Sequence, residues 1–384
     1  MTSVEMQRPK PGAVLFSYGF RPFFLGASLW AVLAMLLWLG MLSGHLMLPV
    51  AVDPVSWHGQ AFAFGYLTAV VAGFLLTAVP NWTGRAPLMG WPLAGLFVLW
   101  LIGRGASLVS ALMPPWVFAL LDNAMPVVLV AVILREIIAG RNWKNLVVLV
   151  LLMLLVAGNL LMHGGVLSVG LRTQVMAGVL MVALIGGRVV PAFTRNWLQK
   201  RDARALPAPM GRFDLLCLLA LCGALALWVV QPEAAVVRGL LVVVGVLHLI
   251  RLWRWKGWLT GAEPLVAILH LGYLCIPLGA VLLGAGASLA AAQHVWMAGA
   301  LGIMTLAVMT RATLGHTGRA LSAGPGTVAI YAAVTGAAVA RLLAAVFDAL
   351  SVELLVLSGL LWIGAFGGFA LLYGPMLLRK RKPA

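Results

Sequence analysis

Seven histidines are the residues in this chain whose type and position could do chemistry. They lie in a sequence that is 63% hydrophobic and 9% charged, with a mean hydropathy of +1.05. An imidazole buried in lipid is costly unless it binds something, and imidazole is a common ligand of haem iron and of copper. Most of the seven fall at two depths, so the sequence predicts two metal or haem sites stacked across a bilayer.

Three histidines group at the outer ends of predicted membrane helices. His58 opens the second apolar run, His163 closes the fifth, and His294 opens the tenth. We interpret them as ligands of a second haem or of copper. His45 also lies on the outer side, but in a short loop, where a solvated histidine without a ligand role is expected.

Two histidines, His248 and His270, share a depth in the inner leaflet. They lie on the eighth and ninth runs, each about 8–9 Å inside the boundary at ~1.5 Å per helical residue. We predict that one or both hold a haem. Tyr273 and Glu263 fall on the helix face of His270, at spacings of three and seven residues. His316, which follows the tenth run, is either a further copper ligand or part of a helix cap.

Other polar residues are candidates for orienting these ligands. Asp122 lies within the fourth run, and Asn159 precedes His163 by one helical turn. A carboxylate inside a membrane span indicates a proton relay or a partner of a ligand. Arg188 and Arg319 are candidates for pairing with haem propionates, although membrane topology alone also places arginines at inner helix ends.

Long apolar runs define the elements that must position these residues. A helix needs about 20 apolar residues to cross the hydrocarbon core, and the sequence contains twelve such runs. The predicted fold is therefore an all-α integral membrane protein, one polytopic domain over residues 1–384. Helices 1–6 occupy about 22–193 and helices 7–12 about 213–377, on either side of a cytoplasmic loop at about 194–212. The runs are 22–42, 57–79, 91–113, 116–138, 145–164, 172–193, 213–231, 235–253, 264–284, 290–312, 326–347 and 353–377.

Basic residues alternate along the loops between these runs. One set of loops carries 21 of the 26 Lys and Arg residues, including Arg8, Lys10 and Lys382. Since Lys and Arg accumulate in cytoplasmic loops, both termini are predicted to be cytoplasmic, in the bacterial inner membrane. The same pattern accounts for the net charge of +16, so nucleic acid is not predicted as a partner.

The three cysteines limit how a haem could be attached. Cys217, Cys222 and Cys275 all lie in apolar runs, and no CxxC or CxxCH motif occurs. A thiolate metal site, a disulfide framework and a covalent haem are therefore not expected. Any haem would be haem b, held non-covalently.

Helices 2, 6 and 10 end in related polar segments. These are residues 77–85, 187–196 and 310–319, which combine Thr, Asn, Gly and Arg. The spacing of about four helices indicates a threefold quasi-repeat like that of haem–copper oxidases. The alternative is that these residues only cap cytoplasmic helix ends.

Long motifs in this chain are similar to those of the NnrS family of bacterial membrane proteins. They occupy residues 20–24, 73–85, 186–197, 269–273 and 304–319. The resemblance covers nearly the whole chain, and it implies a haem- and copper-containing protein associated with nitric oxide metabolism.

The chain departs from the family at the start of helix 2. The family segment usually reads Trp-His-x-His-Glu-Met, whereas this chain has Trp57-His58-Gly59-Gln60-Ala61-Phe62. Glutamine is a poor copper ligand and has no titratable proton. The outer site is therefore expected to be the weaker of the two, with copper weakly bound or absent.

The two layers of histidine favour an inner-membrane haem protein, and the resemblance implies that it binds or detoxifies nitric oxide and protects against nitrosative stress. A nitric-oxide-reacting oxidoreductase would draw electrons from a membrane or quinone donor. Two alternatives stay open. One is a twelve-helix secondary transporter, which suits two six-helix halves. The other is a haem-bearing sensor or metal-insertion factor without turnover.

Overall fold

The computed structural model describes residues 13–381, and Arg8, Lys10 and Lys382 lie outside them. Over this range the chain is helical, with twelve helices long and apolar enough to cross a membrane. The twelve predicted runs are all found. The elements are α1 (Phe20–Leu42), α2 (Pro54–Gln60), α3 (Leu67–Thr83), α4 (Trp91–Leu108), α5 (Pro115–Ala139), α6 (Leu146–His163), α7 (Leu167–Gln199), α8 (Arg212–Val230), α9 (Ala235–Trp253), α10 (Pro264–Gly284), α11 (Leu289–His294), α12 (Met304–His316), α13 (Pro325–Leu343) and α14 (Ser351–Leu378).

Two of the twelve spans contain a π-helical segment. α2 continues into α3 through a π-helical segment, Ala61–Tyr66, and α11 continues into α12 through another, Val295–Ile303. π-helical turns release backbone carbonyls from their usual partners and often occur at functional sites. Here the indoles of Trp30 and Trp100 donate to the carbonyls of Ala61 and Gly65, both at 2.9 Å. Side chains of neighbouring helices therefore stabilise the wider turns of the first π-helical segment.

Helix starts follow the local sequence. Asp53 caps α2, accepting hydrogen bonds from the backbone N–H groups of Val55 and Ser56, with Pro54 as the first helical residue. Ser288 caps α11 by accepting from the N–H of Ala291. Such caps satisfy N–H groups that have no partner within the helix. They fix the start of the two helices that carry His58 and His294.

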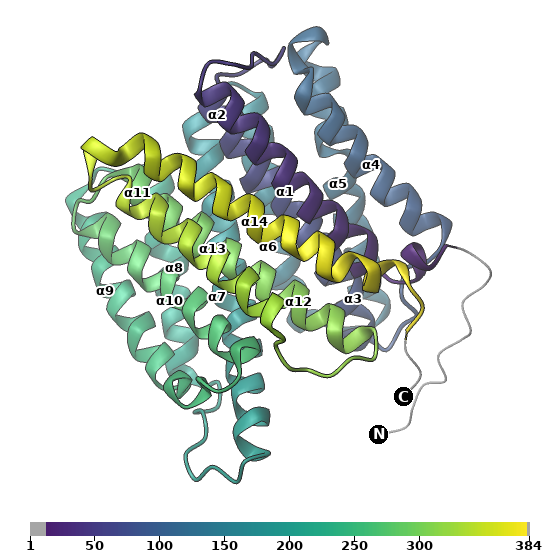
Figure 1. Cartoon of the computed structure of the whole chain (residues 1–384), viewed down its shortest axis with the longest axis vertical. Coiled ribbons are helices and arrows are strands. Elements are labelled where there is room, and N and C mark those ends of the chain that lie inside the picture. The colour runs from purple at the N-terminus through teal and green to yellow at the C-terminus, as the bar shows by residue number, and fades with distance from the viewer. Residues whose placement is uncertain (1–12, 382–384) are drawn as a thin grey trace.

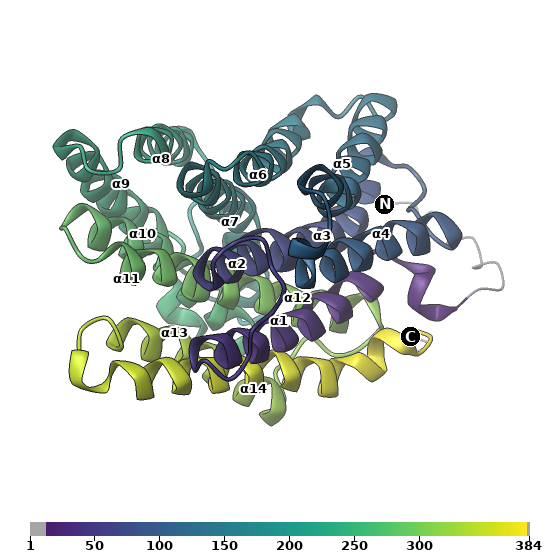
Figure 2. The ribbon, with the colours of Figure 1, turned by 90° about the horizontal axis from the view of Figure 1, so that it is seen from above.

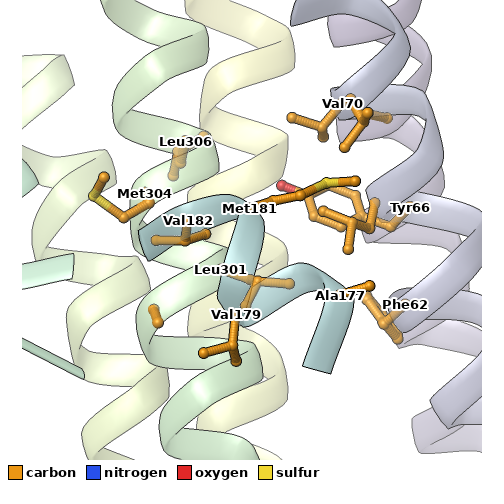
Figure 3. Packing of buried hydrophobic residues seen from close by; sticks show 14 of the residues in the cluster. Phe62, Tyr66, Val70, Ala177, Val179, Met181, Val182, Leu301, Met304 and Leu306 are labelled. Atoms are coloured by element: carbon orange, nitrogen blue, oxygen red, sulfur yellow. The ribbon is translucent and has the colours of Figure 1, made fainter. Parts of the chain in front are cut away.

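The three helices of the predicted quasi-repeat form the centre of the bundle. About 83%, 72% and 78% of the most apolar window is buried in spans 2, 6 and 10, against 33–61% in the others. Residues of all three meet in the core, where Phe62 and Tyr66 lie near Met181 and Leu301 (Figure 3). The Tyr66 hydroxyl is 2.7 Å from the Thr305 hydroxyl. Span 6, unlike the other two, is α-helical throughout, and a threefold symmetry of the whole bundle stays a prediction.

The first and last helices close the bundle. α1 packs along α14, as Figure 1 shows. Arg21 donates to the carbonyls of Leu377 and Arg379, at 2.6 and 2.8 Å. The start of α1 and the end of α14 therefore lie at one end of the bundle, which we call the inner end because the charge pattern predicts it to be cytoplasmic. Seen from above, α7 lies between the α8–α9 pair and the α4–α5 pair (Figure 2).

Candidate functional site

His58 and His294 form a pair at the outer end of the bundle. Their rings are nearly parallel, with an interplanar angle of 15° and centroids 6.3 Å apart. Each histidine stands immediately before or within three residues of a π-helical segment, one in span 2 and the other in span 10. Helices far apart in the sequence thus bring two imidazoles together, as the shared depth predicted.

The hydrogen bonds of the pair leave ligand nitrogens free. Nδ1 of His294 is 2.7 Å from the carbonyl oxygen of Ala290. A carbonyl only accepts, so Nδ1 carries the proton and Nε2 keeps its lone pair. Metal-bound histidines commonly donate their other ring N–H to a backbone carbonyl in this way. Nδ1 of His58 is buried without a hydrogen-bond partner among the described residues.

Aromatic rings and one cation surround the pair. Trp38 stacks on His58 with centroids 4.5 Å apart, and Phe62 lies 5.0 Å from the same ring. Arg341, in the last turn of α13, interacts electrostatically with both histidines. No hydrogen bond or ion pair involving Arg341 occurs among residues 13–381. The surroundings are therefore apolar, with one positive charge available at the edge.

His163 belongs to a different cluster, centred on Asp122. Its Nε2 is 3.0 Å from Oδ2 of Asp122, and Arg104 forms an ion pair with the other carboxylate oxygen. Asn159 and Gln60 donate to Oδ2 at 2.8 and 2.9 Å. The side chains of Asp122 and Arg104 are 0% and 4% exposed. Asp122 therefore accepts a hydrogen bond from Nε2 of His163, and its predicted role as a proton relay or as the partner of a ligand stays a prediction.

Gln60 lies in the Asp122 cluster and not beside His58. Its amide donates to Asp122 and, at 3.0 Å, to Asn159. The family's second histidine, which Gln60 replaces, would therefore belong with His163. From the sequence, we expected Gln60 to weaken one site made of three histidines. The position of Gln60 limits this expected effect to the surroundings of His163. The three histidines predicted to lie together therefore divide into the His58–His294 pair and His163, and Gln60 lies beside His163.

His248 lies in a closed polar network near the inner end. Nε2 is 3.1 Å from the Cys217 carbonyl, and Nδ1 is 2.9 Å from the Tyr273 hydroxyl. Arg251 donates to the same hydroxyl at 2.6 Å and to Asp214 at 2.9 Å. Both nitrogens of this fully buried ring therefore have protein partners. Tyr273, predicted beside His270, directs its hydroxyl to His248.

His270 has a separate environment. Its Nε2 is 2.8 Å from the Thr194 hydroxyl, and its Nδ1 is buried without a partner among the described residues. The ring lines an apolar pocket of about 450 Å³ between α9 and α10. No contact between His248 and His270 occurs among the described residues, so their joint ligation of one haem stays a prediction that the packing does not favour.

The remaining predicted residues have their contacts outside the His58–His294 pair and outside the Asp122 cluster. His316 is exposed and its ring packs at 5.3 Å from that of Phe20. Arg188 is exposed and donates to Asn145, and Arg319 donates to the Thr317 carbonyl. Glu263 caps α10 through the N–H of Leu265. Their predicted cofactor roles stay untested. His45 is exposed in its loop and contacts Ser43, as expected.

Sequence reasoning placed Arg251 on the helix face of His248, but it did not assign roles to Arg341, Arg104 and Asp214 at these sites. All three are charged residues within apolar runs, which marks them as candidates. Their partners come from other helices and could not be read from the sequence. Among residues 13–381, no group of three or more His, Cys, Asp or Glu side chains is arranged to hold a metal ion.

Comparison with known proteins gives one result that covers the chain. The family model described as NnrS protein matches residues 14–381 of the 384 residues. A search of the curated proteins finds no match to this chain. The matched range includes every histidine described above. The chain therefore belongs to the NnrS family, and this membership supports a role related to the nitric oxide response.

Proposed function

We propose that this chain is a haem-binding protein of the bacterial inner membrane that binds nitric oxide and protects against nitrosative stress. The observation that carries the proposal is the His58–His294 pair. Two near-parallel imidazoles meet at the outer end of the bundle, and the hydrogen bond to Ala290 leaves Nε2 of His294 with a free lone pair. Both termini would then be cytoplasmic, as the charge pattern predicts.

The distance between the two rings would allow both imidazoles to hold one metal ion. A metal–nitrogen bond to histidine is about 2 Å long, and a ring nitrogen lies about 1 Å from the ring centre. Two imidazoles that held one metal would therefore have ring centres roughly 6 Å apart, and those of His58 and His294 are 6.3 Å apart. Trp38 and Phe62 provide the apolar contacts that a porphyrin needs. Arg341 is the cation placed to pair with a propionate, in preference to the predicted Arg188 and Arg319.

The two histidines would have different roles. A haem held here would supply an iron that binds nitric oxide. His294 is fixed in orientation by its hydrogen bond to Ala290, whereas Nδ1 of His58 has no such bond. His294 would therefore hold the haem more firmly, and His58 would be the imidazole that is held less rigidly.

Copper, if bound, would involve the His163 cluster. Nε2 of His163 is committed to Asp122, which leaves Nδ1 as the donor atom available to a metal. The amide of Gln60 is committed to Asp122 and Asn159 and offers no imidazole there. We expect copper at well below one equivalent per chain, which agrees with the reasoning from the helix 2 motif.

Chemical conversion of nitric oxide, as opposed to binding alone, requires a source of electrons and protons. A nitric-oxide-reacting oxidoreductase would need a membrane or quinone donor, whereas a sensor would need neither. Consumption of nitric oxide by the purified protein with a chemical reductant separates the two. A secondary transporter, the other alternative, would purify without colour.

The reduced-minus-oxidised absorption spectrum of the detergent-purified protein, with iron and copper quantified on the same sample, tests the proposal. We expect a b-type haem that is lost in His294→Ala, weakened in His58→Ala, and unchanged in the loop control His45→Ala. A metal-free, colourless protein from haem-supplied cells would refute the proposal. If His270→Ala loses haem and His294→Ala keeps it, the haem is held by the inner histidines His248 and His270, as the sequence predicted, and not by the outer pair.

A further inference from the structure

The pocket beside His270 combines an apolar lining with one buried polar atom. It measures about 450 Å³ and lies between the inner halves of α9 and α10. The segment Gly257–Thr260, a 3₁₀ helix, covers its inner end. Apart from His270, the side chains that line it are leucines and tryptophans. A volume of this size is in the range of small-molecule sites.

The mouth of the pocket faces the surroundings of the bundle. Trp253 is 67% exposed and Trp258 is 50% exposed, and Leu249 and Leu271 are also exposed. Because these residues belong to or adjoin membrane-spanning helices, the mouth opens toward lipid. A ligand that enters from the bilayer must be lipid-soluble.

The two tryptophans favour an aromatic ligand. Their ring centroids are 4.1 Å apart with a tilt of 35°, and both rings line the pocket. Flat aromatic faces of this kind stack with another ring. An acyl chain would gain nothing from this arrangement that leucines alone would not provide.

The protonation of His270 defines what its free nitrogen can bind. The Thr194 hydroxyl donates its single proton to the Val190 carbonyl at 2.9 Å. The contact between Thr194 and Nε2 of His270, at 2.8 Å, therefore has Nε2–H as its donor. Nδ1 then keeps a lone pair and is an acceptor. It is buried without a partner, and the whole residue is 8% exposed.

An unpartnered buried acceptor is costly unless a ligand or water completes it. Gly257 lies directly over this atom, since a Cβ at position 257 would come within 2.5 Å of Nδ1. Both residues line the pocket. Because Gly257 has no side chain, no Cβ fills the space next to Nδ1, and a ligand hydroxyl would reach Nδ1 beside this residue.

From these contacts we propose that the His270 pocket binds the head group of a lipid-soluble quinol, with a ring hydroxyl donating to Nδ1. The hydroxyl supplies the missing donor, the ring stacks on the tryptophans, and the isoprenoid tail extends into lipid. A quinone has carbonyls in place of hydroxyls and cannot donate. The site therefore favours the reduced form.

The test compares the two redox forms of one probe. Decylubiquinol and decylubiquinone are titrated under anaerobic conditions into the full-length, detergent-purified protein, and quenching of tryptophan fluorescence is followed. We expect the quinol to bind about tenfold more tightly, the effect of one hydrogen bond to a buried acceptor. Equal affinities for the two forms would refute the proposal, since the pocket would then recognise only the apolar tail.

Two glycine variants of the same segment provide the matched comparison. Gly257→Ala places a methyl group against Nδ1 and should remove the preference for the quinol. Gly261→Ala meets no atom within 4 Å and should keep it. His270→Leu removes the acceptor and should also abolish the preference. A Gly257→Ala variant that discriminates as the parent protein does would overturn the assignment to this pocket.

The quinol proposal and the haem proposal can be tested independently of each other. His294→Ala should lose haem and keep the quinol preference, because the two sites are at opposite ends of the bundle. If His270→Leu loses haem, the pocket is a haem site and the quinol proposal is wrong.

Discussion

Replacement of Asp122 by asparagine tests the central polar contact of the outer half. The Asp122 carboxylate accepts from Arg104, Gln60, Asn159 and His163, and the ion pair with Arg104 is buried. Asparagine keeps the shape and removes the charge, which leaves the Arg104 cation without compensation. Breaking a buried ion pair by removing one partner costs about 3–5 kcal/mol. We expect Asp122→Asn to lower the free energy of unfolding by this amount.

The assay is denaturation by SDS in mixed micelles, followed by circular dichroism. Glu233→Gln is the matched control, because it removes the same kind of charge from the exposed pair of Arg238 and Glu233. An exposed pair is worth about 0–1 kcal/mol. If Asp122→Asn and Glu233→Gln lower the free energy of unfolding equally, the burial of Asp122 does not increase the cost, and the reasoning is refuted.

A double variant sharpens the test. Arg104→Gln with Asp122→Asn removes both charges, so no uncompensated charge remains. The double variant should be more stable than Asp122→Asn alone, by about 1–3 kcal/mol of coupling between neighbouring sites. Additive losses would mean that the two side chains do not interact as the ion pair implies.

Three further predictions concern single contacts. Gly187→Ala should cost about 1–3 kcal/mol of stability, since a Cβ would come within 2.2 Å of Nη2 of Arg251. The open-space control Gly223→Ala should be neutral or stabilising in the same SDS titration. Tyr273→Phe should cost about 1–3 kcal/mol, because it leaves Nδ1 of buried His248 without a partner and removes one of the hydrogen bonds of Arg251; a loss below 0.5 kcal/mol would contradict this. Asp53→Ala should cost about 1 kcal/mol. Hydrogen bonds to Ser56 hold the pKa of the Asp53 carboxyl below its ordinary value of 3.8. Its contribution should therefore be present above that pH and be lost as the pH falls through the lower pKa of the folded state, in a stability series from pH 3 to 7.

The twelve spans could be predicted because each is a separate apolar run, long enough to cross the bilayer. Their ends were less certain. Span 3 ends at Leu108, before the predicted 113, and α7 continues to Gln199, past the predicted 193. The end of α7 is polar, and hydropathy does not report a helix that continues beyond the lipid.

The depth of each histidine followed from helical rise, but its direction around the helix did not. His248 and His270 share a depth, yet one faces Cys217 and Tyr273 and the other faces Thr194. Which rings meet depends on the packing of helices distant in the sequence. The π-helical segments were not predicted either, and the first of them, Ala61–Tyr66, is stabilised by Trp30 and Trp100 from other helices.

The packing of α1 against α14 has a consequence for biosynthesis. Arg21, near the start of the chain, receives its carbonyl partners only when Leu377 and Arg379 have been made. His58 likewise gains its contact with the His294 ring only after His294 has been synthesised. At 5–20 residues per second, tens of seconds separate the synthesis of the two histidines. During that interval the second span lies in the membrane with His58 but without His294. A cofactor that needs both rings can therefore bind only after the tenth span is inserted. A chain truncated before that span could not retain the cofactor.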